Sequence, residues 1–193
     1  MGYLKPHKDD SHLTRKQRQH SLKLAAAMFM SKMGYFPMFE VPVNSHLRAD
    51  LLCVRKIKKA PFYEFAMVEV KSSVQDFKSD SKWTGYLDYC DQFFFCSDPA
   101  TIEIIQNAVE EKHPEVGFIT TRHLLDINPE TAFMMKRSNL HNDNLERMKL
   151  LYQIAKSNCL FFQGIYKGLN KVNISAMDER YDLSTESDLG GLK

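Results

Sequence analysis

The chain has 193 residues, of which 44% are hydrophobic and 26% are charged, and its formal net charge at pH 7 is +2. This composition is typical of a globular protein with a real core. The small net charge excludes a polycation that would bind nucleic acid with its whole surface. No apolar run approaches the roughly 20 residues that span a bilayer, and the polar N-terminus lacks the apolar segment of a signal peptide. We therefore expect a soluble, cytoplasmic protein.

Hydrophobic periodicity and turn residues divide the chain into alternating helices and strands. In chain order the predicted elements are a helix over residues 14–33, three strands over 36–43, 47–55 and 62–71, an aromatic-rich helix from Ser73 to about Tyr89, a strand over 92–96, a helix over 99–112, a strand over 117–121, a short helix opened by Asn128-Pro129, and a helix over 142–157. Gly34 is a predicted helix end, Ser73 with Asp76 a predicted capping box, and Asp98-Pro99 a predicted helix start.

The order α-β-β-β-α-β-α-β predicts an α/β fold in which helices flank a mixed central sheet, with a helical extension towards the C-terminus. The order differs from that of a doubly wound Rossmann fold, and the eight glycines form neither GxGxxG nor GxxxxGK[ST]. The predicted regions are a flexible N-terminal arm (1–13), a core domain (14–125), a helical extension packed on the core (126–170) and a disordered acidic tail (171–193).

Charge and cysteine placement limit the chemistry further. Residues 1–32 hold seven Lys or Arg against two Asp, so this basic region either contacts nucleic acid or is simply solvated. The four cysteines, Cys53, Cys90, Cys96 and Cys159, show no CxxC spacing. We therefore predict reduced, buried thiols and no zinc site.

The chemistry-bearing residues gather on the second and third predicted strands. Asp50 interrupts the apolar run 47–54, and Glu69 interrupts the next apolar run. An ionised carboxylate in an apolar strand is costly to desolvate, and two carboxylates that meet repel each other unless a cation lies between them. If these strands are antiparallel neighbours, Mg²⁺ or Mn²⁺ held by Asp50, Glu69 and the backbone carbonyl of Val70 resolves that conflict.

Lys71 lies two residues after Glu69, so both side chains point to the same face of a strand. Beside a metal and a scissile phosphate, an ammonium group can position or help deprotonate the attacking water and offset charge on the phosphate. Asp50, Glu69 and Lys71 are therefore candidate catalytic residues. A buried ion-pair network without chemistry would use the same residue types, so the residues alone leave both interpretations open.

Neighbouring residues are candidates for contacts to metal or substrate. Glu40 on the first strand is either an outer carboxylate of the metal site or a surface ion-pair partner. The candidate substrate-binding residues are Arg48, Ser72, Ser73, Lys82 and Tyr86. Four of these residues have a structural alternative: Arg48 can pair with Asp50, Ser73 can cap a helix, Lys82 can lie on an exposed helix face, and Tyr86 can belong to the core.

A helix followed by strands that carry Asp50 and Glu69-Val70-Lys71, then a helix and a further strand, resembles the core of the PD-(D/E)xK nuclease superfamily over about residues 14–125. Within that superfamily the chain is most similar to the MmcB-like DNA repair proteins. The residues that carry this similarity are Arg48-Ala49-Asp50, Val68-Glu-Val-Lys-Ser-Ser73, Asp76-Phe77, Asp80-Ser-Lys-Trp83, Tyr86 and Tyr89-Cys-Asp-Gln-Phe-Phe-Phe95. Ala49 stands where the superfamily motif has proline, a change that removes no ligand.

The resemblance implies a restriction-endonuclease-like core in which Asp50 and Glu69 bind Mg²⁺ or Mn²⁺ and Lys71 serves the attacking water. It implies a metal-dependent nuclease that hydrolyses DNA phosphodiester bonds in repair, with RNA as a further candidate substrate. Two other functions stay open. One is a non-catalytic nucleic-acid-binding module on a nuclease scaffold, and the other is a structural or interaction protein in which the triad is an ion-pair network.

Overall fold

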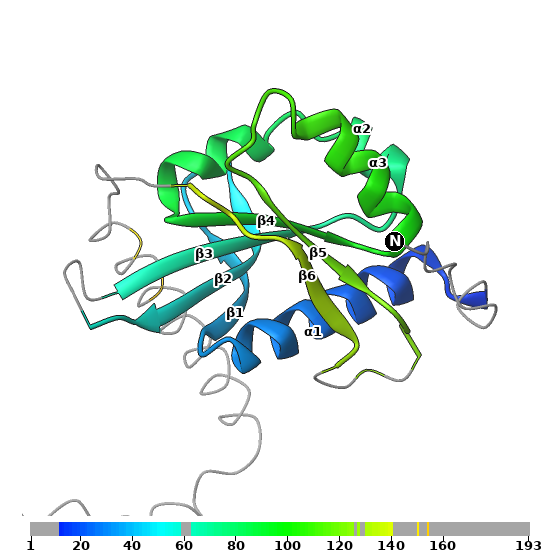
Figure 1. Cartoon of the computed structure of the whole chain (residues 1–193), viewed down its shortest axis with the longest axis horizontal. Coiled ribbons are helices and arrows are strands. Elements are labelled where there is room, and N and C mark those ends of the chain that lie inside the picture. The colour runs from blue at the N-terminus through cyan, green and yellow to red at the C-terminus, as the bar shows by residue number, and fades with distance from the viewer. Residues whose placement is uncertain are drawn as a thin grey trace, which may run out of the picture. The chain divides into compact units, whose positions relative to one another are not determined.

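Helices and strands follow one another in the predicted order as far as the fifth strand. The computed structural model describes residues 12–58, 63–125, 127, 130–140, 150 and 154. The elements are α1 (Arg15–Lys32), β1 (Phe36–Pro42), β2 (Arg48–Lys56), β3 (Tyr63–Val70), α2 (Val74–Lys78), the 3₁₀ helix η2 (Trp83–Tyr89), β4 (Gln92–Ser97), α3 (Pro99–Val109), β5 (Gly117–Thr121) and β6 (Ala132–Lys136). All of them lie within the unit Met1–Ile154 (Figure 1).

The described strands form one mixed six-stranded sheet in the order β1-β2-β3-β4-β5-β6. The first three are antiparallel neighbours, β4 and β5 run parallel to β3, and β6 is antiparallel to β5. Parallel neighbours need a crossover connection, which α2 with η2 provides before β4 and α3 provides before β5. The predicted α/β fold with a mixed sheet is confirmed, as is the antiparallel pairing of β2 with β3.

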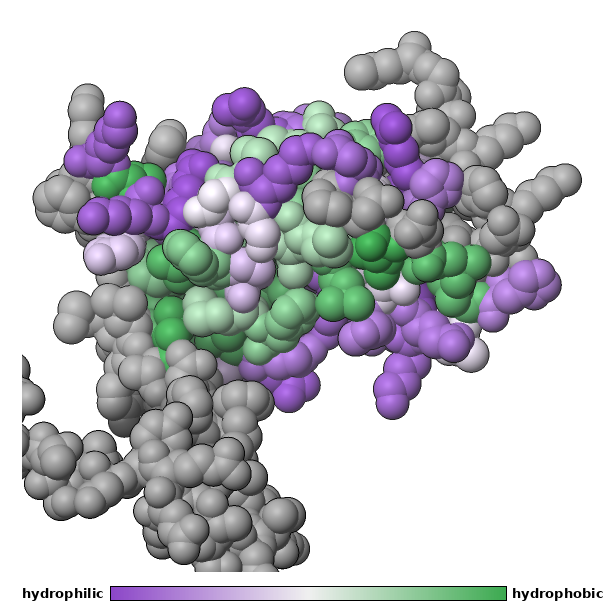
Figure 2. Space-filling view, turned by 90° about the horizontal axis from the view of Figure 1, so that it is seen from below, coloured by the Kyte–Doolittle hydropathy of each residue, from purple (hydrophilic) through white to green (hydrophobic). Residues whose placement is uncertain are grey.

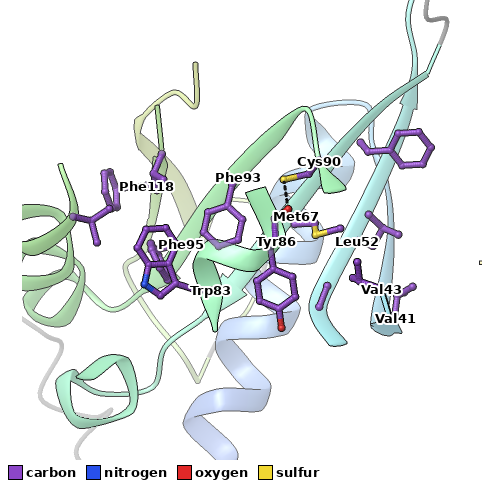
Figure 3. Packing of buried hydrophobic residues seen from close by; sticks show 14 of the residues in the cluster. Val41, Val43, Leu52, Met67, Trp83, Tyr86, Cys90, Phe93, Phe95 and Phe118 are labelled. Carbon is purple, nitrogen blue, oxygen red and sulfur yellow. Dashed lines mark hydrogen bonds between the residues drawn. The ribbon is translucent and has the colours of Figure 1, made fainter. Parts of the chain in front are cut away.

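Helices cover both faces of the sheet (Figure 1). The helix α1 packs on one face, where its buried side chains meet Leu51, Val68 and Phe94. On the other face an aromatic cluster joins η2 and α3 to the sheet, and Figure 3 shows Trp83 beside Phe95 within it. Because β3 and β4 are buried on both faces, their sequences are almost continuous apolar runs.

The ends of the helices follow from local side-chain chemistry. Thr14 and Gln17 form a reciprocal capping box at the start of α1. Gly34, just after α1, has a φ of +82°, which suits glycine because it lacks a Cβ atom. Asp98 caps α3 by accepting from the N–H groups of Ala100 and Thr101. The predicted boundaries at Gly34 and at Asp98-Pro99 are confirmed.

The single aromatic-rich helix predicted from Ser73 to Tyr89 is wrong. The chain forms two short helices there, α2 and η2, with a break between Lys78 and Trp83. In the break, Asp80 accepts from the backbone N–H of Lys82 at 2.8 Å. An Asp side chain that bonds to nearby backbone competes with the helical hydrogen bonds, which accounts for the interruption.

The short helix predicted after Asn128-Pro129 is wrong for residues 132–136, which form the strand β6. Asn128 and Pro129 themselves lie outside the described residues. The pairing of β6 with β5, with Ala132 opposite Thr121, supplies backbone bonds that outweigh the weak local preference of this segment for helix.

Other predicted regions fall largely outside the described residues. This applies to most of the N-terminal arm, to the acidic tail and to most of the helix over 142–157. Within that last range Leu150 is fully buried in the aromatic cluster, and Ile154 packs against it. The predicted arm and tail stay predictions.

The described part of the chain contains no helix with the length and apolar character that crossing a membrane requires. Cys53, Cys90 and Cys96 are buried free thiols, as predicted, and burial raises the pKa of Cys53 to about 12. Cys159 lies outside the described residues.

Candidate functional site

Asp50 lies where β2 and β3 part. The last residues paired between these strands are Leu51 and Val68. Beyond them the backbone N–H of Val70 donates to Asp50 Oδ2 at 2.8 Å. This hydrogen bond places the Asp50 carboxylate against the segment Glu69-Val70-Lys71, so the structure brings together the residues that the sequence analysis grouped.

Glu40 distorts β1 directly opposite Asp50. The residues on either side of Glu40 pair with β2, whereas Glu40 itself has a φ of +53°, a conformation that non-glycine residues rarely adopt. The alternation of side chains along β2 is interrupted at the same level. Ala49 packs in the aromatic cluster, whereas Leu51 packs against α1 on the other face of the sheet. In a regular strand these two side chains would share a face. The distortion accompanies a turn of Asp50 towards α1.

Lys23 reaches this point from α1. Its Nζ lies 2.7 Å from Asp50 Oδ1 and also contacts Glu40 Oε1, and its side chain is only 13% exposed. The second oxygen of Glu40 lies 3.1 Å from Arg48 Nε. Burial lowers the pKa of Lys23, but the hydrogen bonds to Asp50 and Glu40 raise it by more, so Lys23 is an ammonium ion at neutral pH.

Glu69, Lys71 and Asp80 form the adjoining half of the site. Lys71 Nζ donates to Glu69 Oε1 at 2.9 Å and to Asp80 Oδ2, and Lys71 is only 3% exposed. The backbone of Lys71 is fixed to β4, because its N–H donates to the carbonyl of Cys96 and its carbonyl accepts from Ser97 Oγ. The expectation that Glu69 and Lys71 point to the same face is confirmed.

The electrostatics of this half disfavour the ionised form of Glu69. Burial raises the pKa of Glu69 to about 8, and the charge of Asp50 adds to this effect while Lys71 opposes it. Burial lowers the pKa of Lys71, but Glu69 and Asp80 raise it by more, so Lys71 is protonated. Bringing a cation beside Glu69 would stabilise its carboxylate, which is the effect of a bound divalent metal.

Ser72 and Ser73 organise the start of α2. Ser73 Oγ accepts from the N–H of Asp76 at 3.2 Å, which confirms Ser73 as the N-cap. The Asp76 carboxylate accepts from the N–H and Oγ of Ser72 at 3.1 and 3.0 Å, so it does not close the predicted capping box. Arg15 pairs with Asp76 at 3.2 Å and ties α1 to this turn. These bonds account for both serines, and their contact with a phosphate stays a prediction.

Arg48 and Lys82 lie at the edge of the site. Of the two alternatives for Arg48, the pairing with Asp50 does not form, because Arg48 pairs with Glu40 and Asp50 pairs with Lys23. The Arg48 side chain is 67% exposed, so it remains available to a phosphate. Lys82 is exposed and directly precedes η2. Contacts of both residues with substrate stay predictions.

Tyr86 belongs to the core. It is 6% exposed, its ring stacks on Phe93 with 6.1 Å between centroids, and its hydroxyl donates to the carbonyl of Arg48 at 2.9 Å (Figure 3). The ring therefore presents no free face for a base, which favours the structural alternative for this residue. Its hydroxyl instead fixes the backbone two residues before Asp50.

The contacts of Lys23 with Asp50 and of Asp80 with Lys71 were not predicted from the sequence. Lys23 precedes the buried residues Ala26, Ala27 and Met30 by three, four and seven positions, so it lies on an apolar face of α1. A lysine on such a face needs a partner, and that was the available signal. Asp80 belongs to the run that carries the family resemblance, but its contact with Lys71 depends on the break after α2, which no local pattern predicted.

A groove runs between α1 and β1 beside Lys23. Its lining residues are Lys16, Gln19, His20, Lys23, Leu24, Phe39 and Glu40. A second, largely apolar groove shares Leu24 and Phe39 with it. Figure 2 views the molecule from below, the side on which α1 lies in Figure 1, and shows apolar side chains bordered by hydrophilic ones. The groove thus places basic side chains of α1 next to the Glu40 carboxylate.

Asp50 and Glu69 have the donor chemistry of a Mg²⁺ site. Mg²⁺ is commonly bound through one or two carboxylates, with waters and substrate phosphates completing its shell. Across the described ranges, no group of three or more His, Cys, Asp or Glu side chains is arranged to hold a metal. The N–H and C=O of a strand residue point to the same side, so the Val70 carbonyl points towards β2, as its predicted role as a ligand requires.

Comparisons with known proteins identify the family of this chain and a solved structure with a similar fold. A solved structure, the SPO1766 protein of unknown function from Silicibacter pomeroyi, is similar with a TM-score of 0.54 and 21% identity, over 90% of this chain and 99% of that chain, and it shows a shared fold. No curated protein matches. Residues 7–153 match the family described as DNA repair protein MmcB-like. Since that match spans most of the sequence, the chain belongs to the MmcB-like DNA repair protein family.

Proposed function

We propose that this protein is a metal-dependent nuclease that hydrolyses DNA phosphodiester bonds in repair, built on a restriction-endonuclease-like core of the PD-(D/E)xK type. The observation that carries the proposal is the Val70 N–H to Asp50 bond, because it holds one carboxylate against Glu69-Val70-Lys71. The element order from α1 to β4 supports the core topology. Membership of a DNA repair family supports DNA as the partner.

Asp50, Glu69 and the carbonyl of Val70 would hold Mg²⁺ or Mn²⁺. When bound, the metal supplies Lewis-acid stabilisation of the charge that develops on the scissile phosphate. The protein contributes a rigid frame for this task, since Val70 N–H fixes Asp50 Oδ2 and the buried position of Glu69 limits its movement. Preorganised groups of this kind need no rearrangement when the charge develops.

Lys71 would orient the attacking water. Its raised pKa makes it an ammonium, which donates hydrogen bonds and does not accept a proton. Two of its three N–H groups point to Glu69 and Asp80, which leaves one for a water or a phosphate oxygen. Of the two roles that the sequence suggested for Lys71, positioning water is therefore favoured over removing its proton.

One observation favours a second candidate, a non-catalytic nucleic-acid-binding module. Both carboxylates already have a lysine neighbour without a metal, Lys23 for Asp50 and Lys71 for Glu69. An ion-pair network of this kind needs no chemistry. The two candidates differ in whether DNA is cut when a divalent metal is added.

A cleavage assay tests the proposal. Supercoiled plasmid, single-stranded DNA and RNA are incubated with Mn²⁺, Mg²⁺ or EDTA, using wild-type protein, Asp50→Ala, Lys71→Ala and the control Lys32→Ala. We expect metal-dependent DNA cleavage by wild type and the control, and losses on the order of 100-fold or more in the other two. Circular dichroism checks that both variants remain folded. Full cleavage by either variant rules out the assigned roles, and binding of DNA without cleavage under any condition supports the second candidate.

A further inference from the structure

The ammonium of Lys23 stands where it neutralises two carboxylates at once. It lies 2.7 Å from Asp50 Oδ1 and contacts Glu40 Oε1. The backbone of Glu40 has a φ of +53°. Non-glycine residues held in this region are strained, and such strain persists only where the surrounding contacts impose it. The pairing of Lys23 with these carboxylates is therefore a built feature of the fold.

A divalent metal on Asp50 would meet this ammonium. Both oxygens of Asp50 have partners, since Lys23 takes Oδ1 and the N–H of Val70 takes Oδ2. A dication bound to the same carboxylate would lie within a few ångströms of the positive charge of Lys23. At about 4 Å such repulsion is large in a partly desolvated site. The metal and the ammonium thus compete for the same carboxylate.

The structure offers the displaced side chain another place. Lys23 also lines the groove between α1 and β1, together with Lys16, His20 and Phe39. A lysine side chain has four rotatable bonds along a flexible stem, so rotation can carry its ammonium from Asp50 into this groove without movement of α1. Glu40 lines the same groove and can keep its contact with Lys23 during that rotation.

We propose that Lys23 is the built-in counter-ion of Asp50 in the metal-free protein, and that a divalent metal binds by displacing its ammonium towards the α1–β1 groove. The inference rests on the proposed function, because it takes Asp50 as a metal ligand. Lys23 is then a positioning residue that weakens metal binding while it keeps the empty site folded. Removing its charge should tighten metal binding, whereas a merely structural lysine would weaken binding when removed.

The test measures Mn²⁺ binding to the full chain without DNA, using the electron paramagnetic resonance signal of free Mn²⁺. Lys23→Met is compared with wild type and with Lys32→Met, which breaks a different α1 ion pair, the one to Glu130. We expect the Mn²⁺ dissociation constant to fall on the order of tenfold in Lys23→Met and to change by less than about twofold in Lys32→Met. Lys23→Met should also have a lower melting temperature than wild type in EDTA, and Mn²⁺ should raise its melting temperature by more than that of wild type. If Lys23→Met fails to fold, Lys23→Gln takes its place.

The outcomes separate this inference from the proposed function. Binding of Mn²⁺ by wild type, with equal or weaker binding by Lys23→Met, overturns the inference alone. An equal gain in Lys32→Met also overturns it, because the effect would then be one of net charge. Absence of Mn²⁺ binding in every protein overturns the proposed function and the inference with it.

Discussion

Val70 and Asp50 are joined by a 2.8 Å hydrogen bond across the point where β2 and β3 part. Asp50 therefore has two roles. Its carboxylate accepts from a buried backbone N–H, and it is also a candidate metal ligand. Stability and metal binding at this position can therefore be separated by choosing substitutions that keep one role and remove the other.

Replacing Asp50 with Asn or with Ala separates the two roles. Asn keeps an oxygen that accepts from Val70 N–H, whereas Ala leaves that N–H without its partner. We expect Asp50→Ala to be less stable than Asp50→Asn by about 1–3 kcal/mol in EDTA, the cost of an unsatisfied buried group, and both to lose Mn²⁺ binding. Urea denaturation measures the difference. Equal stability of the two variants would show that the Val70 bond contributes little.

Glu69→Gln tests whether the ionised carboxylate of Glu69 lowers the stability of the folded protein. The pKa of Glu69 is raised to about 8 in the folded protein, against an ordinary value near 4.5. Between these values the folded state holds a proton that the unfolded state has released, so stability falls as pH rises from about 4.5 to 8 and is level above that. Gln does not titrate, so the free energy of unfolding of Glu69→Gln should not fall in this way. In EDTA it should therefore increase relative to that of wild type as pH rises through this window, by a few kcal/mol in total.

The measurement is urea denaturation of wild type and Glu69→Gln at several pH values between 5 and 9, in the presence of EDTA. The same variant should show no thermal shift when Mn²⁺ is added, because a ligand that binds only the native state must stabilise it. A constant stability difference across this pH range would contradict the raised pKa. A wild-type-like thermal shift would contradict the role of Glu69 as a ligand.

Glu40→Gly and Glu40→Ala form a matched pair for the strained backbone opposite Asp50. Both remove the contacts with Lys23 and Arg48, and they differ mainly in whether a Cβ must fit a φ of +53°. Glycine adopts this conformation freely, whereas alanine pays about 1–2 kcal/mol for it. We therefore expect Glu40→Gly to be the more stable variant by about 1 kcal/mol in thermal or urea unfolding. A more stable alanine variant would show that the strand relaxes once the side chain is gone.

Tyr86→Phe tests whether the Tyr86 hydroxyl contributes to stability or to DNA binding. The change removes the hydroxyl that donates to the Arg48 carbonyl and keeps the buried ring. We expect a loss of about 1 kcal/mol in unfolding free energy and unchanged affinity for single-stranded DNA in a gel-shift assay. Weaker DNA binding at unchanged stability would return Tyr86 to the substrate-binding surface.

The sequence predicted those parts of the site that depend on local periodicity. Glu69 and Lys71 share a face because strand side chains alternate, and Asp50 meets them because β2 and β3 are consecutive strands with an antiparallel pairing. Apolar runs and caps also predicted the order of the elements through β5, except for the break that separates α2 from η2.

The remainder depends on contacts between distant segments. The pairing of Lys23 with Asp50 requires the position of α1 on the sheet, and the reach of Asp80 to Lys71 requires the chain to break after α2. The positive φ of Glu40 accompanies ion pairs with Lys23 on α1 and Arg48 on β2, and no local pattern in the sequence marks it. Local propensity also failed at β6, where pairing with β5 decides the conformation.

The central claim is that Asp50 and Glu69 bind a divalent metal, and anomalous scattering from Mn²⁺-soaked crystals tests it most directly. We expect one strong peak about 2.0–2.5 Å from an oxygen of each carboxylate, with Lys23 Nζ moved away from Asp50 Oδ1. Absence of a peak between these residues, at a Mn²⁺ concentration that supports DNA cleavage and with the Lys23 and Lys71 ion pairs intact, would contradict it.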